Sequence, residues 1–216
     1  MMTKKVYIFD FDGTLVDSMP SWSAKMLNIL HKTNTPYPAD VVRRITVLGD
    51  MGTAKYFKEE LGVPLTFEEM YAMMDEFALP KYRDEILLKD GVREYLAGLR
   101  KAGVSLGVLT ASPHRMVDPC LKRLGIFDWF ERVRTSEDFG KVKSDPTIYA
   151  DAAAEFGVKP ADVVFFDDNI GAVKTAASAG MRTVGVYDAT GEDFADELRT
   201  AADYYVTNLG ELPENL

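Results

Sequence analysis

Short runs of apolar and β-branched residues recur along the chain and predict buried strands. Five of these runs are nearly uninterrupted, which is typical of parallel strands that helices cover on both faces. They are Val6–Phe9, Val104–Leu109, the weaker Arg132–Thr135, Val163–Phe166 and Thr183–Tyr187, with a sixth candidate at Tyr204–Val206.

Helical patterns lie between the predicted strands. Asp90 is placed to cap a helix that Gly103 ends, and another helix has Pro146 near its first turn and Gly157 past its end. Strands and helices alternate in this way over residues 104–206. The alternation predicts an α/β fold, with a Rossmann-like parallel sheet and helices on both faces.

The segment after the first predicted strand breaks this alternation. It contains no convincing strand, and Thr66 with Glu69 forms a capping-box pattern at the start of a helix. We therefore expect an α/β core of residues 1–16 and 89–216, and an inserted all-helical subdomain of residues 17–88. The helices expected in the insertion are Pro20–His31, Ala39–Ile45, Thr53–Leu61 and Thr66–Ala78.

Composition and charge narrow the class of protein. The formal net charge of −9 argues against nucleic acid as a partner, because phosphate backbones are bound by clusters of Lys and Arg. A small anionic substrate stays compatible with this charge, since a metal ion and a few donors reverse the field inside one pocket. No apolar run approaches the ~18–20 residues that span a bilayer, so we expect no membrane partner.

Cysteine usage indicates the compartment. Cys120 is the single cysteine, so the chain forms no internal disulfide, and no secretory signal is evident. Both observations predict a cytoplasmic protein. The sequence leaves open whether the protein is a monomer or a homodimer.

Two carboxylates stand at the end of the first predicted strand. Asp10 and Asp12 open the run DFDGTLVDS, where ionised groups need a counter-charge or hydrogen-bond donors. Ligands of open α/β sheets bind at the carboxyl ends of strands. The alternative is that both residues only cap a turn before Gly13.

Three later segments make the alternative weaker. A hydroxyl, Thr110, follows the second strand, Lys143 precedes a helix, and Asp167 and Asp168 follow the fourth strand. A carboxylate can attack phosphorus, while Mg²⁺ and a lysine neutralise the anionic phosphate. A second carboxylate can protonate the leaving group and then activate water. This set of residues favours phosphoryl transfer.

The motifs resemble those of the haloacid dehalogenase superfamily, in particular its phosphatases with a helical cap, of the phosphoglycolate phosphatase and β-phosphoglucomutase type. The resemblance covers nearly the whole chain, and DFDGTLVDS is its most specific part. It implies that Asp10 is the nucleophile and a Mg²⁺ ligand. Asp12 is implied to be the general acid and base, with its backbone carbonyl on the metal. Asp168 is implied to be the main late metal ligand, with Asp167 a direct or water-mediated partner.

The resemblance also implies how the phosphate is bound. Thr110 and the amide of Ala111 would hold the transferring phosphoryl group, Phe11 counts with them as a phosphate-binding residue, and Lys143 would neutralise nucleophile and phosphate. The helical insertion of residues 17–88 resembles a mobile cap that closes over the site and excludes water.

Two departures from the family pattern stand out. The lysine motif usually reads Lys-Pro-x-Pro, but Ser144 replaces its first proline, and Lys141 competes with Lys143 for the role. We favour Lys143 because its spacing to the following helix fits better. In the usual fourth motif a second acid follows the main metal-binding acid by four residues, and the position four residues after Asp168 is Ala172.

These expectations combine into a Mg²⁺-dependent phosphomonoester hydrolase that acts on a small phosphate ester through an aspartyl phosphate. The alternatives are a phosphomutase, which Lys25 could assist, a C–halogen hydrolase, and a non-catalytic regulatory module. The sequence does not choose among phosphate esters, because cap residues select the leaving group.

Overall fold

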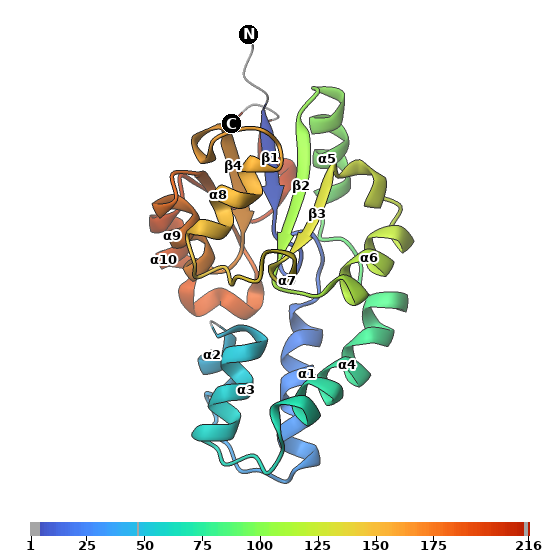
Figure 1. Cartoon of the computed structure of the whole chain (residues 1–216), viewed down its shortest axis with the longest axis vertical. Helices are drawn as coiled ribbons and strands as arrows, with labels where there is room; N and C mark the ends of the chain where they lie inside the picture. The colour runs from blue at the N-terminus through green and yellow to red at the C-terminus, as the bar shows by residue number, and fades with distance from the viewer. Residues whose placement is uncertain (1–4, 47, 214–215) are drawn as a thin grey trace.

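The computed structural model describes residues 5–46, 48–213 and 216 and contains one six-stranded sheet in which every strand pair is parallel (Figure 1). The strand order is β3-β2-β1-β4-β5-β6. The strands are β1 (Val6–Phe9), β2 (Ser105–Thr110), β3 (Arg132–Thr135), β4 (Val163–Asp167), β5 (Arg182–Val186) and β6 (Tyr204–Val206).

Helices fill most of the remaining described chain. Those that precede β2 are α1 (Met19–Lys32), α2 (Val41–Thr46), α3 (Gly49–Glu59), α4 (Phe67–Asp84) and α5 (Val92–Lys101). Those that follow it are α6 (His114–Arg123), α7 (Ser136–Phe139), α8 (Thr147–Ala154), α9 (Ile170–Ser178) and α10 (Ala195–Ala201). Short 3₁₀ helices include η3 (Ala189–Phe194) and η4 (Leu209–Glu211).

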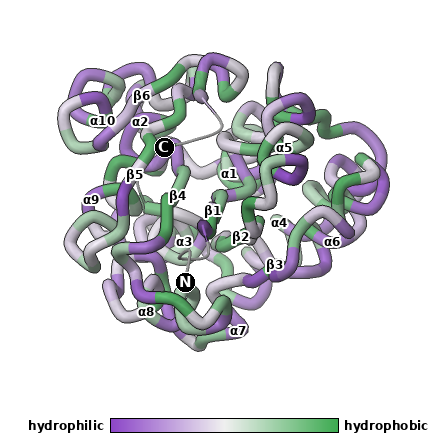
Figure 2. Tube along the Cα trace, turned by 90° about the horizontal axis from the view of Figure 1, so that it is seen from above, coloured by the Kyte–Doolittle hydropathy of each residue, from purple (hydrophilic) through white to green (hydrophobic). Residues whose placement is uncertain are grey.

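The sheet has a separate hydrophobic core on each face. Tyr7 and Phe9 of β1 belong to the core formed with α5 and α6, whereas Val6 and Ile8 belong to the core formed with α8 and α9. This alternation follows from the two-residue period of a strand. Figure 2 shows the same arrangement from above, with β1 central, α5 and α6 on one side and α8 and α9 on the other. The predicted α/β, Rossmann-like fold is confirmed.

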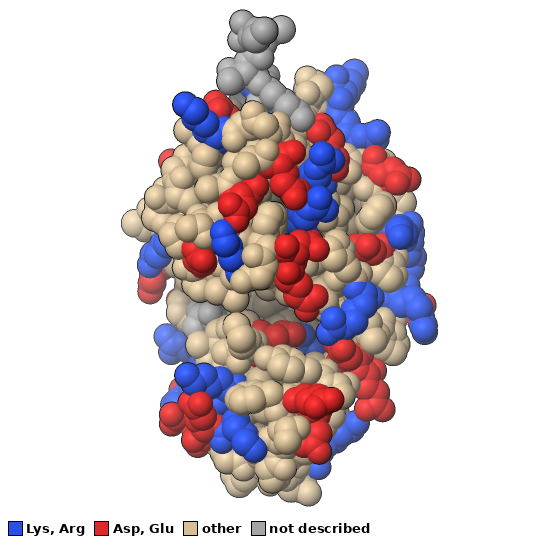
Figure 3. All heavy atoms as spheres, viewed as in Figure 1, with Lys and Arg blue, Asp and Glu red and all other residues tan. Residues whose placement is uncertain are grey.

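Helices α1–α4 form a second part of the molecule, which we call the helical lobe; the sheet and its helices form the sheet lobe (Figure 1). The helical lobe has its own core, in which Met26 of α1, Phe57 of α3 and Met70 of α4 are fully buried. The capping box at the start of α4 is present, because Thr66 and Glu69 bond one another reciprocally. Figure 3 shows a hollow between the two lobes on the viewed face. The division at residues 16/17 and 88/89 stays a prediction.

Element boundaries differ from the prediction where tertiary packing decides them. Asp90 does not cap α5: the N-cap is Gly91, whose φ of +77° and close approach to Asn208 suit only glycine. Helix α4 continues past Ala78 to Asp84 because Tyr82 in its last turn is buried against the sheet lobe.

Two further helices of the insertion start at other residues than expected. Helix α3 begins at Gly49 instead of Thr53, and α2 begins at Val41 instead of Ala39. Cys120 lies buried on α6. Within the described residues, no helix combines the length and the apolar character needed to cross a membrane.

Candidate active site

Asp10 directly follows β1, at the centre of the carboxyl edge of the sheet. Its backbone N–H donates to the carbonyl of Phe166 in the neighbouring strand β4 at 2.8 Å, which continues the parallel pairing by one residue. The side chain is buried, with 6% of the residue exposed. The topology therefore places this carboxylate beside the end of β4, where Asp167 and Asp168 stand.

Lys143 supplies positive charge at this edge. Its Nζ contacts a carboxylate oxygen of Asp10 and lies 2.8 Å from Oδ2 of Asp167. The hydroxyl of Tyr149 on α8 donates to the Lys143 carbonyl at 2.9 Å and so fixes the segment that carries Lys143. Burial lowers the pKa of Lys143, but the charges of Asp10 and Asp167 outweigh burial and hold this pKa above its usual value. The competing residue, Lys141, pairs with Asp151 instead.

Three carboxylates form a compact cluster. Asp10, Asp167 and Asp168 each offer an oxygen, and these oxygens lie within 4.8 Å of one another. Burial raises the pKa of Asp10 to about 8; the charge of Lys143 opposes this rise, and the charges of Asp167 and Asp12 add to it. Burial and the charge of Asp167 likewise raise the pKa of Asp168 well above its usual value. The cluster carries more negative than positive charge.

These donors fit a hard divalent cation. Mg²⁺ prefers carboxylate oxygens, and its charge would offset the repulsion that raises the two pKa values. The backbone also leaves room for the cluster. Gly13 has a φ of +74°, and a Cβ atom on it would collide with the carboxylate of Asp168. Thr14 donates to Oδ1 of Asp168 at 3.3 Å.

The carboxylate of Asp12 lies outside this cluster. Three hydroxyls donate to it: Ser18 to Oδ1 at 2.5 Å, Tyr82 to the same oxygen at 2.6 Å, and Ser112 to Oδ2. Burial raises the pKa of Tyr82 well above its usual value and the charge of Asp12 raises it further, so the phenol keeps its proton. The expected contact of the Asp12 carbonyl with a metal stays a prediction.

The expected phosphate-binding residues lie at the same edge of the sheet. Thr110 ends β2 and is buried, and its hydroxyl accepts the N–H of Ser112 at 3.0 Å. Ala111 follows and is exposed. The side chain of Phe11 is fully buried, so its backbone is the part that can reach a ligand.

Comparison with known proteins decides the family. A sequence model of haloacid dehalogenase-like hydrolases matches residues 4–180, most of the chain. The chain belongs to this family. This match confirms the family resemblance noted in the sequence and the prediction that the protein is a hydrolase.

Relatives of this haloacid dehalogenase-like hydrolase match over nearly its full length. YhcW of Bacillus subtilis is 30% identical over 210 residues, covering 92% of this chain and 93% of that protein. Hexitol phosphatase B of Escherichia coli K12 is 26% identical over 211 residues, covering 95% and 92%. The solved structure of CbbY from Rhodobacter sphaeroides with phosphate has a TM-score of 0.80 at 21% identity, covering 97% and 96%, and supports the fold.

The sequence did not indicate some of the residues that contact the candidate active site of this hydrolase. Tyr82 comes from the helical lobe and reaches Asp12, about 70 residues away in the chain, and no local signal indicates that contact. Lys89 donates to the carbonyls of Gly13 and Tyr187, each at 2.6 Å, and pairs with Asp188 at 3.1 Å. Through its bond to the Gly13 carbonyl, Lys89 stabilises the turn that follows Asp12.

The helical lobe contributes a buried ion pair of its own. Lys25 is 2% exposed, and its Nζ lies 2.8 Å from Oδ2 of Asp50. The indole N–H of Trp22 donates to the other oxygen of Asp50 at 2.7 Å. Burial is the main cause of the raised pKa of Tyr82, and the charge of Asp50 adds to that rise.

Four basic residues outside the cluster take part in pairs at the surface. His114 contacts Asp118 and Asp138, and Arg115 bonds both carboxylate oxygens of Asp75 on α4, at 2.9 and 3.0 Å. Two arginines of α2, Arg43 and Arg44, pair with Asp193 and Asp40. In these positions the side chains are occupied by partners away from the carboxylate cluster.

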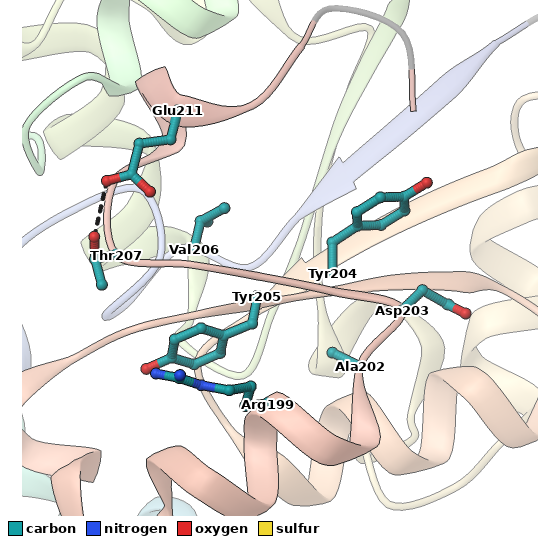
Figure 4. Close-up of a pocket in the computed structure, with 8 residues that line it drawn as sticks. All are labelled: Arg199, Ala202, Asp203, Tyr204, Tyr205, Val206, Thr207 and Glu211. Carbon is teal, nitrogen blue, oxygen red and sulfur yellow. Dashed lines mark hydrogen bonds between the residues drawn. The ribbon is translucent and has the colours of Figure 1, made fainter.

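A surface pocket of about 350 Å³ lies apart from the cluster, at the β6 edge of the sheet (Figure 4). Arg199 of α10 lies over the ring of Tyr205, and Thr207 donates to Glu211. None of the residues of the carboxylate cluster lines this pocket.

Proposed function

We propose that this protein is a Mg²⁺-dependent phosphatase that hydrolyses a small phosphate monoester through an aspartyl phosphate on Asp10. One observation carries the proposal: Lys143 bridges Asp10 and Asp167 within a three-carboxylate cluster, and Asp12 stands beside the cluster with a separate set of donors. A nucleophile, a cation and an acid/base group are thus available at one edge of the sheet. The phosphatase names of relatives support the class.

Asp10 attacks phosphorus and forms the acyl phosphate. As the bond to the leaving oxygen breaks, Asp12 transfers its proton to that oxygen. Asp12 then takes a proton from water, which attacks the aspartyl phosphate and releases phosphate and Asp10. Lys143 balances the charge of nucleophile and phosphate throughout. Mg²⁺, when held by Asp10, Asp167 and Asp168, supplies further neutralisation of the phosphate oxygens.

Neighbouring groups orient the phosphate in this proposal. Thr110 ends β2, Ala111 directly follows it, and Phe11 lies two residues past the end of β1. The hydroxyl of Thr110 and the backbone amides of Phe11 and Ala111 would hold the non-bridging oxygens. The helical lobe acts as a cap. The direct contact of its Tyr82 with Asp12 supports exclusion of water from the acyl phosphate.

A phosphomutase would require a second phosphate to be held while the product turns. Lys25, the residue that could have assisted it, is 2% exposed and already neutralised by Asp50. This pairing places a net neutral, hydrogen-bonding group on the lobe instead of a free cation. It favours hydrolysis over transfer between two phosphate positions.

The other two alternatives explain less of the site. A C–halogen hydrolase needs no proton for its departing halide and no Mg²⁺, so it would leave the donors around Asp12 and the Asp168 carboxylate without a role. A non-catalytic module would not need Asp10, Lys143 and Asp12 together. Their convergence supports an enzyme.

We propose a phosphorylated sugar or polyol as the substrate. The side chain of Asp50 on the helical lobe is 37% exposed, and a carboxylate accepts hydrogen bonds from hydroxyl groups. The relative named hexitol phosphatase B supports the same class.

The expected partners and location complete the proposal. The net charge of −9 supports a small-molecule substrate in preference to nucleic acid, and a single buried cysteine supports a cytoplasmic location.

A screen of phosphorylated sugars, polyols, phosphoglycolate and nucleoside monophosphates, each with and without Mg²⁺, tests this function. We expect phosphate release that depends on Mg²⁺, is greatest for hydroxyl-rich esters and is lost in Asp10→Asn. No need for a bisphosphate activator is expected. Metal-independent release, or unchanged turnover in Asp10→Asn, would refute the proposal.

A further inference from the structure

Tyr82 makes a buried contact with the carboxylate of Asp12 from the other lobe. Its hydroxyl donates to Oδ1 at 2.6 Å, and the residue is 2% exposed. The ring stacks on that of Phe11, with centroids 6.0 Å apart and planes inclined by 28°. Ring and hydroxyl are therefore both fixed.

The backbone around Tyr82 is held as firmly as its ring. Arg123 of α6 donates through Nη2 to the carbonyl of Tyr82 at 3.3 Å and also contacts the carbonyl of Ile86. These bonds tie the last turn of α4 to the sheet lobe. Tyr82 thus lies at the junction of the lobes, two residues after Pro80, whose missing N–H interrupts the helical bonds of α4.

The donors are divided unequally between the two oxygens of Asp12. Oδ1 accepts from both Ser18 and Tyr82, whereas Oδ2 meets the hydroxyl of Ser112. Two donors occupy the acceptor sites of Oδ1, so a proton added to the carboxyl goes to Oδ2. The hydroxyl of Ser112 can turn to accept a hydrogen bond, and so is compatible with both states of Oδ2.

We propose that Tyr82 is a positioning residue for Asp12, and that it directs the catalytic proton to Oδ2. The proton passes from Oδ2 to the leaving oxygen while the bond from phosphorus to that oxygen breaks and the bond from Asp10 to phosphorus forms. Asp12 is left as a carboxylate, with Tyr82 and Ser18 still donating to Oδ1. This inference rests on the proposed role of Asp12 as the general acid.

The dependence of kcat/KM on the leaving group tests the proposal, because kcat/KM covers the steps up to departure of that group. Wild type and Tyr82→Phe are compared on p-nitrophenyl, phenyl and glycerol phosphates. The p-nitrophenolate ion needs little protonation, whereas an alkoxide needs it fully. We expect a loss of less than about 3-fold for the first ester and roughly 10–100-fold for the last, part of the ~10²–10⁴-fold that a general acid contributes.

Tyr95→Phe is the matched control. Tyr95 is a buried tyrosine that packs against Phe9, and its hydroxyl points to the carbonyl of Pro213, away from Asp12. This variant is expected to match wild type on every ester. An equal loss on all three esters in Tyr82→Phe, or no loss on any, would overturn the positioning role.

A double variant separates this proposal from the proposed function. Asp12→Asn should itself show a leaving-group-dependent loss; if it does not, the function assigned to Asp12 fails whatever Tyr82 does. Adding Tyr82→Phe to Asp12→Asn should cost nothing further, because Tyr82 acts through Asp12. If the double variant loses the sum of the two single losses in kcat/KM, the positioning role is contradicted. This holds even if Tyr82→Phe alone lowers the stability of the fold.

Discussion

A Cβ atom on Gly13 would lie 2.6 Å from the carboxylate carbon of Asp168, so the turn after β1 and the end of β4 meet at a point that only glycine can occupy. The φ of +74° at Gly13 adds a second reason for glycine. The turn therefore determines where the carboxylate of Asp168 can lie.

Gly13→Ala should lose activity by more than its loss of stability explains. The left-handed backbone costs about 1–2 kcal/mol for any non-glycine residue, and the collision displaces Asp168 in addition. We expect turnover to fall by ~10²-fold, as a 1 Å displacement at a reacting centre can cause. Gly103→Ala is the control, because φ there is +77° and nothing lies within 4 Å. Equal activity losses in the two variants would contradict the account.

Mg²⁺ should raise the melting temperature of the wild type, since the proposed metal site is the folded cluster of Asp10, Asp167 and Asp168. At a concentration 100 times its Kd, a ligand of the native state stabilises it by ~2.7 kcal/mol. Asp168→Asn should melt no lower than wild type without metal, because the substitution removes one of three repelling carboxylates. Added Mg²⁺ should change the melting temperature of Asp168→Asn little. If Mg²⁺ raises the melting temperature of this variant as much as that of the wild type, Asp168 is excluded as a ligand.

Lys143 and Lys141 should differ sharply when each is replaced by methionine. Lys143→Met leaves the buried carboxylates of Asp10 and Asp167 without their cation, so we expect turnover to fall by ~10²–10³-fold and stability by about 3 kcal/mol. Lys141 pairs with the half-exposed Asp151, and its loss should cost at most about 1 kcal/mol. Steady-state kinetics and urea unfolding measure both. A larger kinetic defect in Lys141→Met would reverse the assignment.

His114 should stabilise the fold in a pH-dependent way. Burial lowers the pKa of His114, but the hydrogen bonds and charges of Asp118 and Asp138 outweigh burial and raise the pKa above its usual value. The stabilisation is therefore complete below the unfolded pKa of about 6.5 and is lost as pH rises through the folded value. Wild type should exceed His114→Gln in free energy of unfolding by more at acidic than at alkaline pH, and added salt should shrink the gap. A gap that widens with pH would refute the assignment.

The sequence was sufficient to predict those parts of the fold that depend on local pattern. The strand bounds at Val6–Phe9 agree with the structure, because an uninterrupted apolar run specifies a buried parallel strand. The bounds of the weaker strand, Arg132–Thr135, also agree. Since parallel strands end at a common edge, the proximity of Asp10, Asp167 and Asp168 also followed from their place after strands.

The parts that could not be predicted depend on tertiary packing. Tyr82 reads as one more aromatic residue of a helix, and only the docking of α4 on α6 brings it to Asp12. The pairing of Lys25 with Asp50 likewise needs α1 and α3 to be placed side by side. Asp90 was the expected helix cap, but the approach of Asn208, over a hundred residues later, selects Gly91.

Detection of a phosphoryl group on Asp10 tests the central claim most directly. Asp12→Asn would be mixed with p-nitrophenyl phosphate and Mg²⁺, quenched in acid and digested for peptide mass spectrometry. The activated leaving group lets the first step proceed without the acid, while loss of the base slows hydrolysis of the acyl phosphate. We predict one phosphoryl group on the peptide at Asp10, and none in Asp10→Asn/Asp12→Asn. Release of p-nitrophenol with no phosphorylated peptide, or a phosphoryl group on another residue, would contradict the covalent scheme.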